Sequence, residues 1–169
     1  MVSGNVHAYV LADDGVIPNS RLPLFLYEQA AELGGADPPA AIEATLRGNE
    51  WGHGWRNGVF PYHHYHSTAH EVLVVYAGSA RVQLGGERGI VTTLNPGDVV
   101  IIPAGVGHKN LGASPDFRVV GAYPLGQTWD VCYGKSGERP MSDENIARVP
   151  MPMADPIFGR QGPLLAHWR

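Results

Sequence analysis

The sequence contains very little cysteine and no long hydrophobic run. Its one cysteine, Cys132, has no partner for a disulfide within the chain, so the reducing cytoplasm is the simplest expected compartment. The longest apolar runs, VLVVYA and VVIIPA, have the length of a strand and fall far short of a bilayer span. The N-terminus, MVSGNVHAYVLADDG, lacks a basic region followed by an apolar stretch, so we expect neither a signal peptide nor a membrane partner.

Positive charge is also scarce. Lysine and arginine together number 12 against 16 acidic residues, which gives a net charge of -4, and no basic cluster stands out. This balance disfavours nucleic acid as a partner. A chain of 169 residues with 44% hydrophobic and 17% charged residues is typical of one globular domain that can bury a core.

Glycine and proline, by contrast, are abundant, with 22 and 14 residues. Between about residues 59 and 123 they separate short apolar or alternating runs, which read VFPYHHYH, EVLVVYA, ARVQL, IVTTL, VVIIP, HKNLG and FRVVGAY. Closely spaced strands with Gly/Pro turns and no helical interruption favour an all-β fold, either an antiparallel sandwich or a barrel.

The segments on either side differ from this pattern. HAYVL (7–11) predicts a strand that could join a sheet edge, and LPLFLYEQAAEL (22–33) predicts a short helix. A helix is also predicted over 37–49, where Asp37 is the expected N-cap and Gly48 the stop. We therefore expect a single domain over 1–169. Its parts are an N-terminal strand with short helices (1–57), a barrel core (about 58–123) and an irregular Pro-rich C-terminal arm (124–169).

The stretch HHYHSTAHE (63–71) holds four of the eight histidines. If it begins as a strand, residues two apart share a face, so His64 and His66 point one way and His63 points the other. Two such rings can converge on one metal ion. The alternative is a solvated polar loop with no task.

The residue that completes the set is not fixed by geometry. The residues STA after His66 favour a bend, and a new strand would then begin at His70 or Glu71. Either side chain could face the pair. Chemistry favours Glu71, because an anionic oxygen neutralises part of the charge of a divalent ion.

A wider spacing surrounds these residues: Gly58, His64, His66, Glu71 and Gly78 form one set, and Gly97, Pro103, Gly105 and His108 form a second. The two sets resemble the two signatures of the cupin superfamily. One position departs from the family pattern: Gly112 stands where an asparagine is usual, and the nearest asparagine is Asn110.

This resemblance implies a single cupin-type antiparallel β-barrel, a jelly-roll-like double-stranded β-helix. It also implies that His64, His66, Glu71 and His108 hold one divalent ion, which could be Fe, Mn, Ni, Cu or Zn. Small cupins form homodimers, so we expect a homodimer in which residues 7–11 pair with a partner's sheet or pack at its edge.

A pocket for a small-molecule ligand is expected beside the metal. Its predicted wall consists of Phe60, Tyr62, Asn110 and Tyr123. The tryptophans Trp51, Trp55 and Trp129 either roof this pocket or belong to the core or an interface, which is the commoner place for large aromatics.

The resemblance leaves several functions open. The preferred one is a metalloenzyme of dioxygenase type that acts on a small oxygen-rich metabolite, with its catalytic residues not assigned. The alternatives are a non-catalytic binding or sensing module and a metal-dependent isomerase. An isomerase needs an interior base, but Lys109 adjoins His108 and is expected to point outward, so the sequence offers no convincing candidate.

Overall fold

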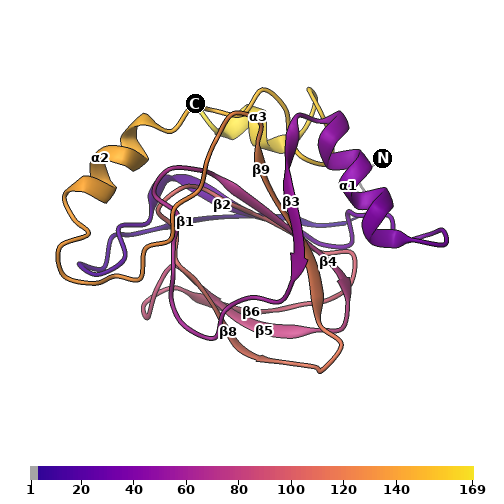
Figure 1. Cartoon of the computed structure of the whole chain (residues 1–169), viewed down its shortest axis with the longest axis horizontal. Coiled ribbons are helices and arrows are strands. Elements are labelled where there is room, and N and C mark those ends of the chain that lie inside the picture. The colour runs from indigo at the N-terminus through magenta and orange to yellow at the C-terminus, as the bar shows by residue number, and fades with distance from the viewer. Residues whose placement is uncertain (1–3) are drawn as a thin grey trace.

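The computed structural model describes residues 4–169, which form two antiparallel sheets (Figure 1). The larger sheet contains, in spatial order, β1 (Val6–Leu11), β2 (Ser20–Tyr27), β7 (Val99–Ile102), β4 (Glu71–Ala77), β9 (Arg118–Pro124) and β3 (Trp51–Asn57). The smaller sheet contains β6 (Ile90–Leu94), β5 (Ala80–Leu84) and β8 (His108–Ala113). The predicted all-β class is therefore confirmed, and over residues 4–169 the two sheets form a sandwich, not one continuously hydrogen-bonded barrel.

Within the described part of the chain, three helices lie outside the sheets, namely α1 (Pro38–Gly48), α2 (Met141–Arg148) and α3 (Pro163–His167). Helix α1 confirms the helix predicted over 37–49. The Asp37 carboxylate caps it, as expected, by accepting a hydrogen bond from the Ala40 amide at 3.2 Å. Among the residues described, no helix combines the length and the apolar character that crossing a bilayer requires.

The central strands of the larger sheet are buried on both faces. Along β4, Val72 and Val74 pack against α1, α3 and the C-terminal arm, whereas Leu73 and Val75 pack between the two sheets. Each fully buried side chain of this kind contributes roughly 1.5–3 kcal/mol to folding. Burial on both faces explains why β4 reads as a continuous apolar run instead of an alternating one.

One prediction is wrong for the same reason, namely burial on both faces of the sheet. Residues 22–33 were expected to contain a short helix, but the apolar part of this stretch belongs to β2, which pairs with β1 and β7. A short apolar run that is buried on two faces has no period that distinguishes a strand from a buried helix.

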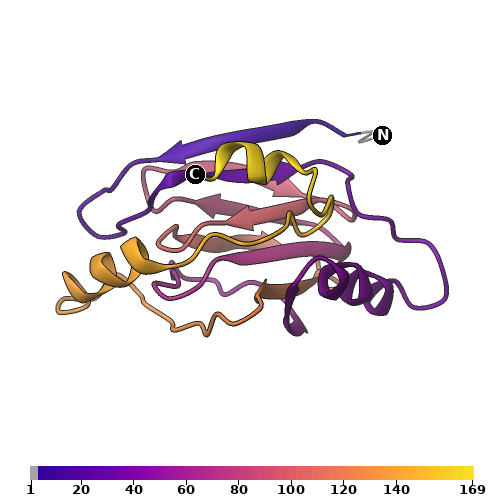
Figure 2. The same ribbon diagram turned by 90° about the horizontal axis from the view of Figure 1, so that it is seen from above.

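Two further parts of the chain depart from the sequence-based expectation. The stretch 51–57, for which no strand was predicted, forms β3 at one edge of the larger sheet. The C-terminal arm is irregular for much of its length but contains α2 and α3, and its Trp168 packs into the core beneath α3. Figure 2 shows β1 as the outermost strand on the opposite edge.

Candidate metal centre

The segment that carries His64 and His66 joins β3 to β4 and is not a regular strand. This corrects the strand expected over 59–66: within that stretch only isolated bridges form, one of them between His64 and His108. The amide of His108 donates to the carbonyl of His64 at 3.0 Å, and the amide of His64 donates to the carbonyl of His108 at 3.3 Å. This pair of bonds fixes the histidine segment to the first residue of β8.

A glycine in the second signature holds the same segment from another side. The amide of Gly105 donates to the carbonyl of His66 at 2.8 Å. Gly105 has a φ of 96°, and a Cβ at this position would lie 2.3 Å from the Asn19 carbonyl oxygen. Only glycine fits both this backbone conformation and this close approach.

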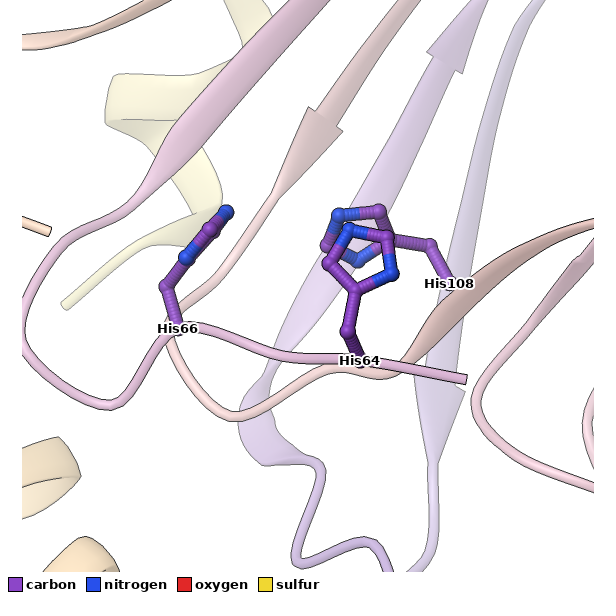
Figure 3. A group of neighbouring side chains, drawn as sticks. All are labelled: His64, His66 and His108. Carbon is purple, nitrogen blue, oxygen red and sulfur yellow. The ribbon is translucent and has the colours of Figure 1, made fainter. Parts of the chain in front are cut away.

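Three imidazole rings come together as a result. One ring nitrogen from each of His64, His66 and His108 lies within 4.8 Å of the others, and all three residues are buried. Figure 3 shows His64 and His66 rising from the same stretch of chain and His108 coming from a neighbouring strand. The prediction that His64 and His66 face the same side is met even though the segment is irregular.

The hydrogen bonds of the three rings determine which nitrogen is free. The Nδ1 atom of His64 lies 3.1 Å from the Tyr62 carbonyl, and that of His108 lies 3.1 Å from the Val106 carbonyl. The Nδ1 atom of His66 bonds the Asp130 carbonyl. Because a carbonyl oxygen only accepts, each Nδ1 must carry the proton, and each neutral ring therefore has an unshared electron pair on Nε2.

Glu71, the first residue of β4, directs its carboxylate toward two of these rings. Its Oε2 atom lies 3.1 Å from Nε2 of His66 and 3.1 Å from Nε2 of His108. In the tautomer with the proton on Nδ1, neither ring donates to Oε2, so within residues 4–169 this buried oxygen has no hydrogen-bond donor. Glu71 shares its face of β4 with Leu73 and Val75, and this register directs its carboxylate into the space between the two sheets.

The ionisation of this group follows from burial and from mutual charge. Burial, reinforced by the neighbouring His108, lowers the pKa of His64 to about 3. Burial also lowers the pKa of His66, but the Glu71 carboxylate together with Asp130 raises it by more, so that it ends above its ordinary value. For Glu71, burial raises the pKa, and the two histidines beside it lower it by more, so the carboxyl stays ionised.

These observations fit a bound cation. The Nε2 atoms of His66 and His108 each stand about 3 Å from the Glu71 carboxylate oxygen, an arrangement that is unfavourable unless a proton or a metal ion lies between them. Three imidazole nitrogens and one carboxylate oxygen suit zinc and the redox-active divalent metals. The buried histidine triad could therefore hold a metal ion, with Glu71 well placed to complete the set.

The other two histidines of the cluster lie elsewhere. His63 points away from the triad, as predicted, and its Nε2 pairs with Glu87 at 2.9 Å. His70 faces the opposite side of the sheet from Glu71, where its ring packs on Trp168 and its Nδ1 accepts a hydrogen bond from the Ala104 amide at 2.9 Å. The structure therefore favours Glu71 over His70 as the neighbour of the triad.

A cavity of about 380 Å³ opens beside the three histidines and Glu71. Its apolar lining consists of Trp55, Val59, Phe60, Leu73, Trp129 and Val131. A volume of this size is at the lower end of the range for small-molecule sites.

The predicted pocket wall is reproduced at two of its four positions. Phe60 and Tyr123 line the cavity, whereas Tyr62 and Asn110 do not. The Tyr62 ring stacks on the ring of Phe60, and the Asn110 carboxamide oxygen accepts a hydrogen bond from the Gly112 amide at 2.9 Å. The exposed backbone of Gly112 offers the Asn110 side chain a local partner, which keeps it away from the cavity.

Two supporting contacts were not found by sequence reasoning. The Tyr123 hydroxyl accepts a hydrogen bond from the Trp55 indole at 2.9 Å and donates one to Oε1 of Glu71 at 3.5 Å. Asp130 accepts a hydrogen bond from the Ser67 amide at 2.6 Å and bonds the Ser67 hydroxyl, while its carbonyl holds His66. Both contacts join segments more than 50 residues apart in sequence, and no local pattern marks such a pair.

Comparison with known proteins gives the family. Residues 55–119, which include both signatures, match the family model described as a cupin domain. The chain belongs to the cupin superfamily. It is 44% identical over 161 residues to the uncharacterized protein YjlB of Bacillus subtilis (strain 168), an alignment that covers 95% of this chain and 94% of that protein.

Similarity to solved structures is weaker. A DUF861 family protein from Thermotoga maritima is 22% identical, with a TM-score of 0.33 over 53% of this chain and 94% of its own. The ribosomal oxygenase YcfD from Escherichia coli is 17% identical, with a TM-score of 0.40 over 62% of this chain and 32% of its own. Likenesses of this size are too small to bear on function.

Proposed function

We propose that this protein binds one divalent metal ion through His64, His66, His108 and Glu71 and acts as a dioxygenase-like enzyme on a small oxygen-rich molecule. The observation that carries the proposal is the convergence of unshared electron pairs from these residues beside a mainly apolar cavity. The chemistry that such an ion supplies is Lewis acidity toward ligand oxygens and, for iron, manganese, nickel or copper, electron transfer with dioxygen.

The chain's own residues prepare the site for this chemistry. The carbonyls of Tyr62, Val106 and Asp130 hold the three imidazoles in the tautomer that leaves Nε2 free. The apolar lining limits access of water to a reactive intermediate. When both atoms of dioxygen enter the substrate and the substrate supplies all four electrons, no external reductant is consumed, so a reaction of this kind requires no second cofactor.

The lining also disfavours the isomerase alternative. An isomerase needs a base that can move a proton between carbon atoms. Beyond the four proposed ligands, the titratable groups that line the cavity are His53, Arg56 and Tyr123. His53 is solvent-exposed, Arg56 is paired with Glu43, and burial raises the pKa of Tyr123, so none is placed as an interior base.

The proposal is tested by reconstitution without oxygen. Protein produced without a histidine tag would be loaded separately with Fe²⁺, Mn²⁺, Ni²⁺, Cu²⁺ or Zn²⁺ and then exposed to dioxygen with an enediol, a β-diketone or a 2-oxo acid. We expect oxygen uptake with at least one redox-active metal, none with Zn²⁺, and none in His108→Ala.

Another result would favour the binding module. If every metal gave no uptake with any compound while calorimetry showed tight ligand binding, the dioxygenase proposal would be rejected. Failure of the wild type to retain any metal would reject the proposed site itself.

A further inference from the structure

Two large aromatic side chains stand exposed at the cavity beside the triad. Phe60 is 47% exposed and Trp129 is 41% exposed, and both belong to the cavity lining. An isolated exposed aromatic ring needs no explanation. Exposed apolar side chains that gather at a concave site are typical of a surface that binds a ligand.

Each of these rings is supported by a second ring. Phe60 stacks on Tyr62, with ring centroids 5.1 Å apart and planes 11° from parallel. Trp129 stacks on Tyr123, with centroids 4.4 Å apart and planes 5° from parallel. The backing rings hold Phe60 and Trp129 in position before any ligand arrives, so a flat ligand loses little affinity to side-chain ordering.

The cavity offers no unpaired charge to an ionic ligand. Among the described residues, Arg56 is the one Lys or Arg side chain in the lining, and its charge is paired with the Glu43 carboxylate, to which Nε and Nη2 donate at 2.7 and 2.9 Å. A ligand that carried a phosphate or an additional carboxylate would bury that charge without a partner. The lining therefore favours a ligand whose polar atoms are confined to the end near the histidines.

We propose that the molecule recognised here is a planar aromatic compound with two adjacent oxygen donors, such as an ortho-dihydroxyarene. Its oxygens would face His64, His66, His108 and Glu71, and its ring would pack against Trp129 and Phe60. This inference rests on the proposed metal site and narrows its ligand class from any chelating metabolite to aromatic ones.

A matched pair of chelators separates ring stacking from chelation and from size. Benzohydroxamic acid and cyclohexanecarbohydroxamic acid present the same two oxygen atoms and rings of similar size, but only the first ring is flat and aromatic. The probe protein is the chain loaded with Co²⁺, and the visible spectrum of cobalt reports ligand exchange at the metal. We expect the benzo compound to bind about three- to tenfold tighter, the range that aromatic stacking supplies.

Variants locate the origin of that preference. Trp129→Leu should abolish the difference in affinity between the two hydroxamates. Trp129→Phe, which keeps an aromatic ring, should retain this difference. Tyr133→Leu is the matched control for the Trp129 ring, since Tyr133 is also 41% exposed but does not line the cavity, and its ring contacts Tyr62 and not the Trp129–Tyr123 pair. This control should behave as the wild type.

The outcomes distinguish this inference from the function on which it rests. Equal affinity for both hydroxamates in cobalt-loaded wild type would overturn the aromatic ligand class and leave the metal site standing. A preference that survives in Trp129→Leu would also overturn it. Protein that retains no cobalt, or whose cobalt spectrum responds to neither compound, would contradict the proposed function itself.

Discussion

His63 and His66 lie three positions apart, yet they stand in different surroundings. The Nε2 atom of His66 is free and lies 3.1 Å from Glu71, whereas that of His63 pairs with Glu87 at the surface. We expect wild-type protein to hold about one divalent ion per chain, as a site with four ligands does, and His66→Ala to lose most of it. Elemental analysis of untagged protein measures this directly.

The control for this prediction is His63→Ala, which removes a histidine from the same cluster without touching the proposed site. It should keep the wild-type metal content. Equal metal content in wild type and His66→Ala would remove His66 from the ligand set.

The Tyr123 hydroxyl links Trp55 to Glu71 by hydrogen bonds, and it donates to Oε1, the second oxygen of the Glu71 carboxylate. Tyr123→Phe leaves the Trp55 indole without its acceptor and Oε1 of Glu71 without its donor. We expect the metal-free protein to lose about 1–3 kcal/mol of unfolding free energy, the usual cost of unpaired buried polar groups. Urea unfolding measures this loss, and a metal titration should show weaker binding because Glu71 is less well oriented.

Tyr62→Phe is the matched control for this change. The Tyr62 ring stacks on Phe60 and does not line the cavity, so deletion of its hydroxyl should alter neither stability nor metal affinity. If both variants behaved alike, the network from Trp55 to Glu71 would have no special role.

Among the elements, the histidine segment shows what sequence can and cannot predict. Signature spacing brought His64, His66, Glu71 and His108 together in the prediction, and the structure gathers the same four residues. Alternation placed His63 away from them even though 59–66 is not a strand, because the bridges at His64 and Tyr65 impose an extended backbone locally. The supports provided by Asp130 and Tyr123 could not be predicted, since they depend on contacts distant in sequence.

Helices and strands were predicted best where a local signal exists. Asp37 and the prolines after it marked the start of α1, and burial of Ile42 and Leu46 on one face is observed. No such signal marks β2, whose Phe25 and Leu24 belong to different cores on the two faces of the sheet. The missed helix α2 lacks a side-chain cap and follows Pro140, so its surroundings were interpreted as irregular.

The ion pair between Glu43 on α1 and Arg56 on β3 makes the attachment of this helix dependent on pH. The hydrogen bonds from Arg56 lower the pKa of Glu43 from its ordinary value of 4.5. A carboxyl whose pKa is lower in the folded state stabilises the fold above its unfolded pKa, and that contribution disappears as pH falls through the folded value. Glu43→Gln should therefore be less stable than wild type at neutral pH, with the difference vanishing well below pH 4.5.

Urea midpoints measured from neutral pH down to about pH 3 check this dependence, within the range where carboxyls titrate. The control is Glu32→Gln, a carboxyl that forms no ion pair among the residues described. If the difference in urea midpoint between Glu43→Gln and wild type stayed constant with pH, the ion pair would stabilise the fold through packing and not through charge.

For the molecule as a whole, the cavity of the candidate metal centre is lined by β3, one edge strand of the larger sheet, and not by β1, the other edge strand. The histidines lie between the sheets, with His108 contributed by the smaller one. The outer edges of the larger sheet are β1 and β3. An assembly formed through β1 would therefore leave the cavity lining, which includes several residues of β3, uncovered.

The exposed edge at β1 argues for a homodimer. This strand pairs with β2 on one side only, and its Val10 and Val6 are 70% and 40% exposed. Open edges with apolar side chains are normally covered, and a second copy of this chain can supply the same edge. We expect light scattering to give twice the chain mass of 18.2 kDa, and Val10→Asp, which places a charge in the contact, to shift the protein toward the monomer.

Val91→Asp provides the comparison, because Val91 is 44% exposed on β6, an edge of the other sheet. It should leave the dimer intact. If Val91→Asp dissociated while Val10→Asp stayed dimeric, the interface would have to lie on the smaller sheet. A wild-type mass of one chain would exclude the dimer. Since no residue of β1 lines the cavity beside the triad, monomeric Val10→Asp should keep its metal, which separates assembly from the chemistry of the site.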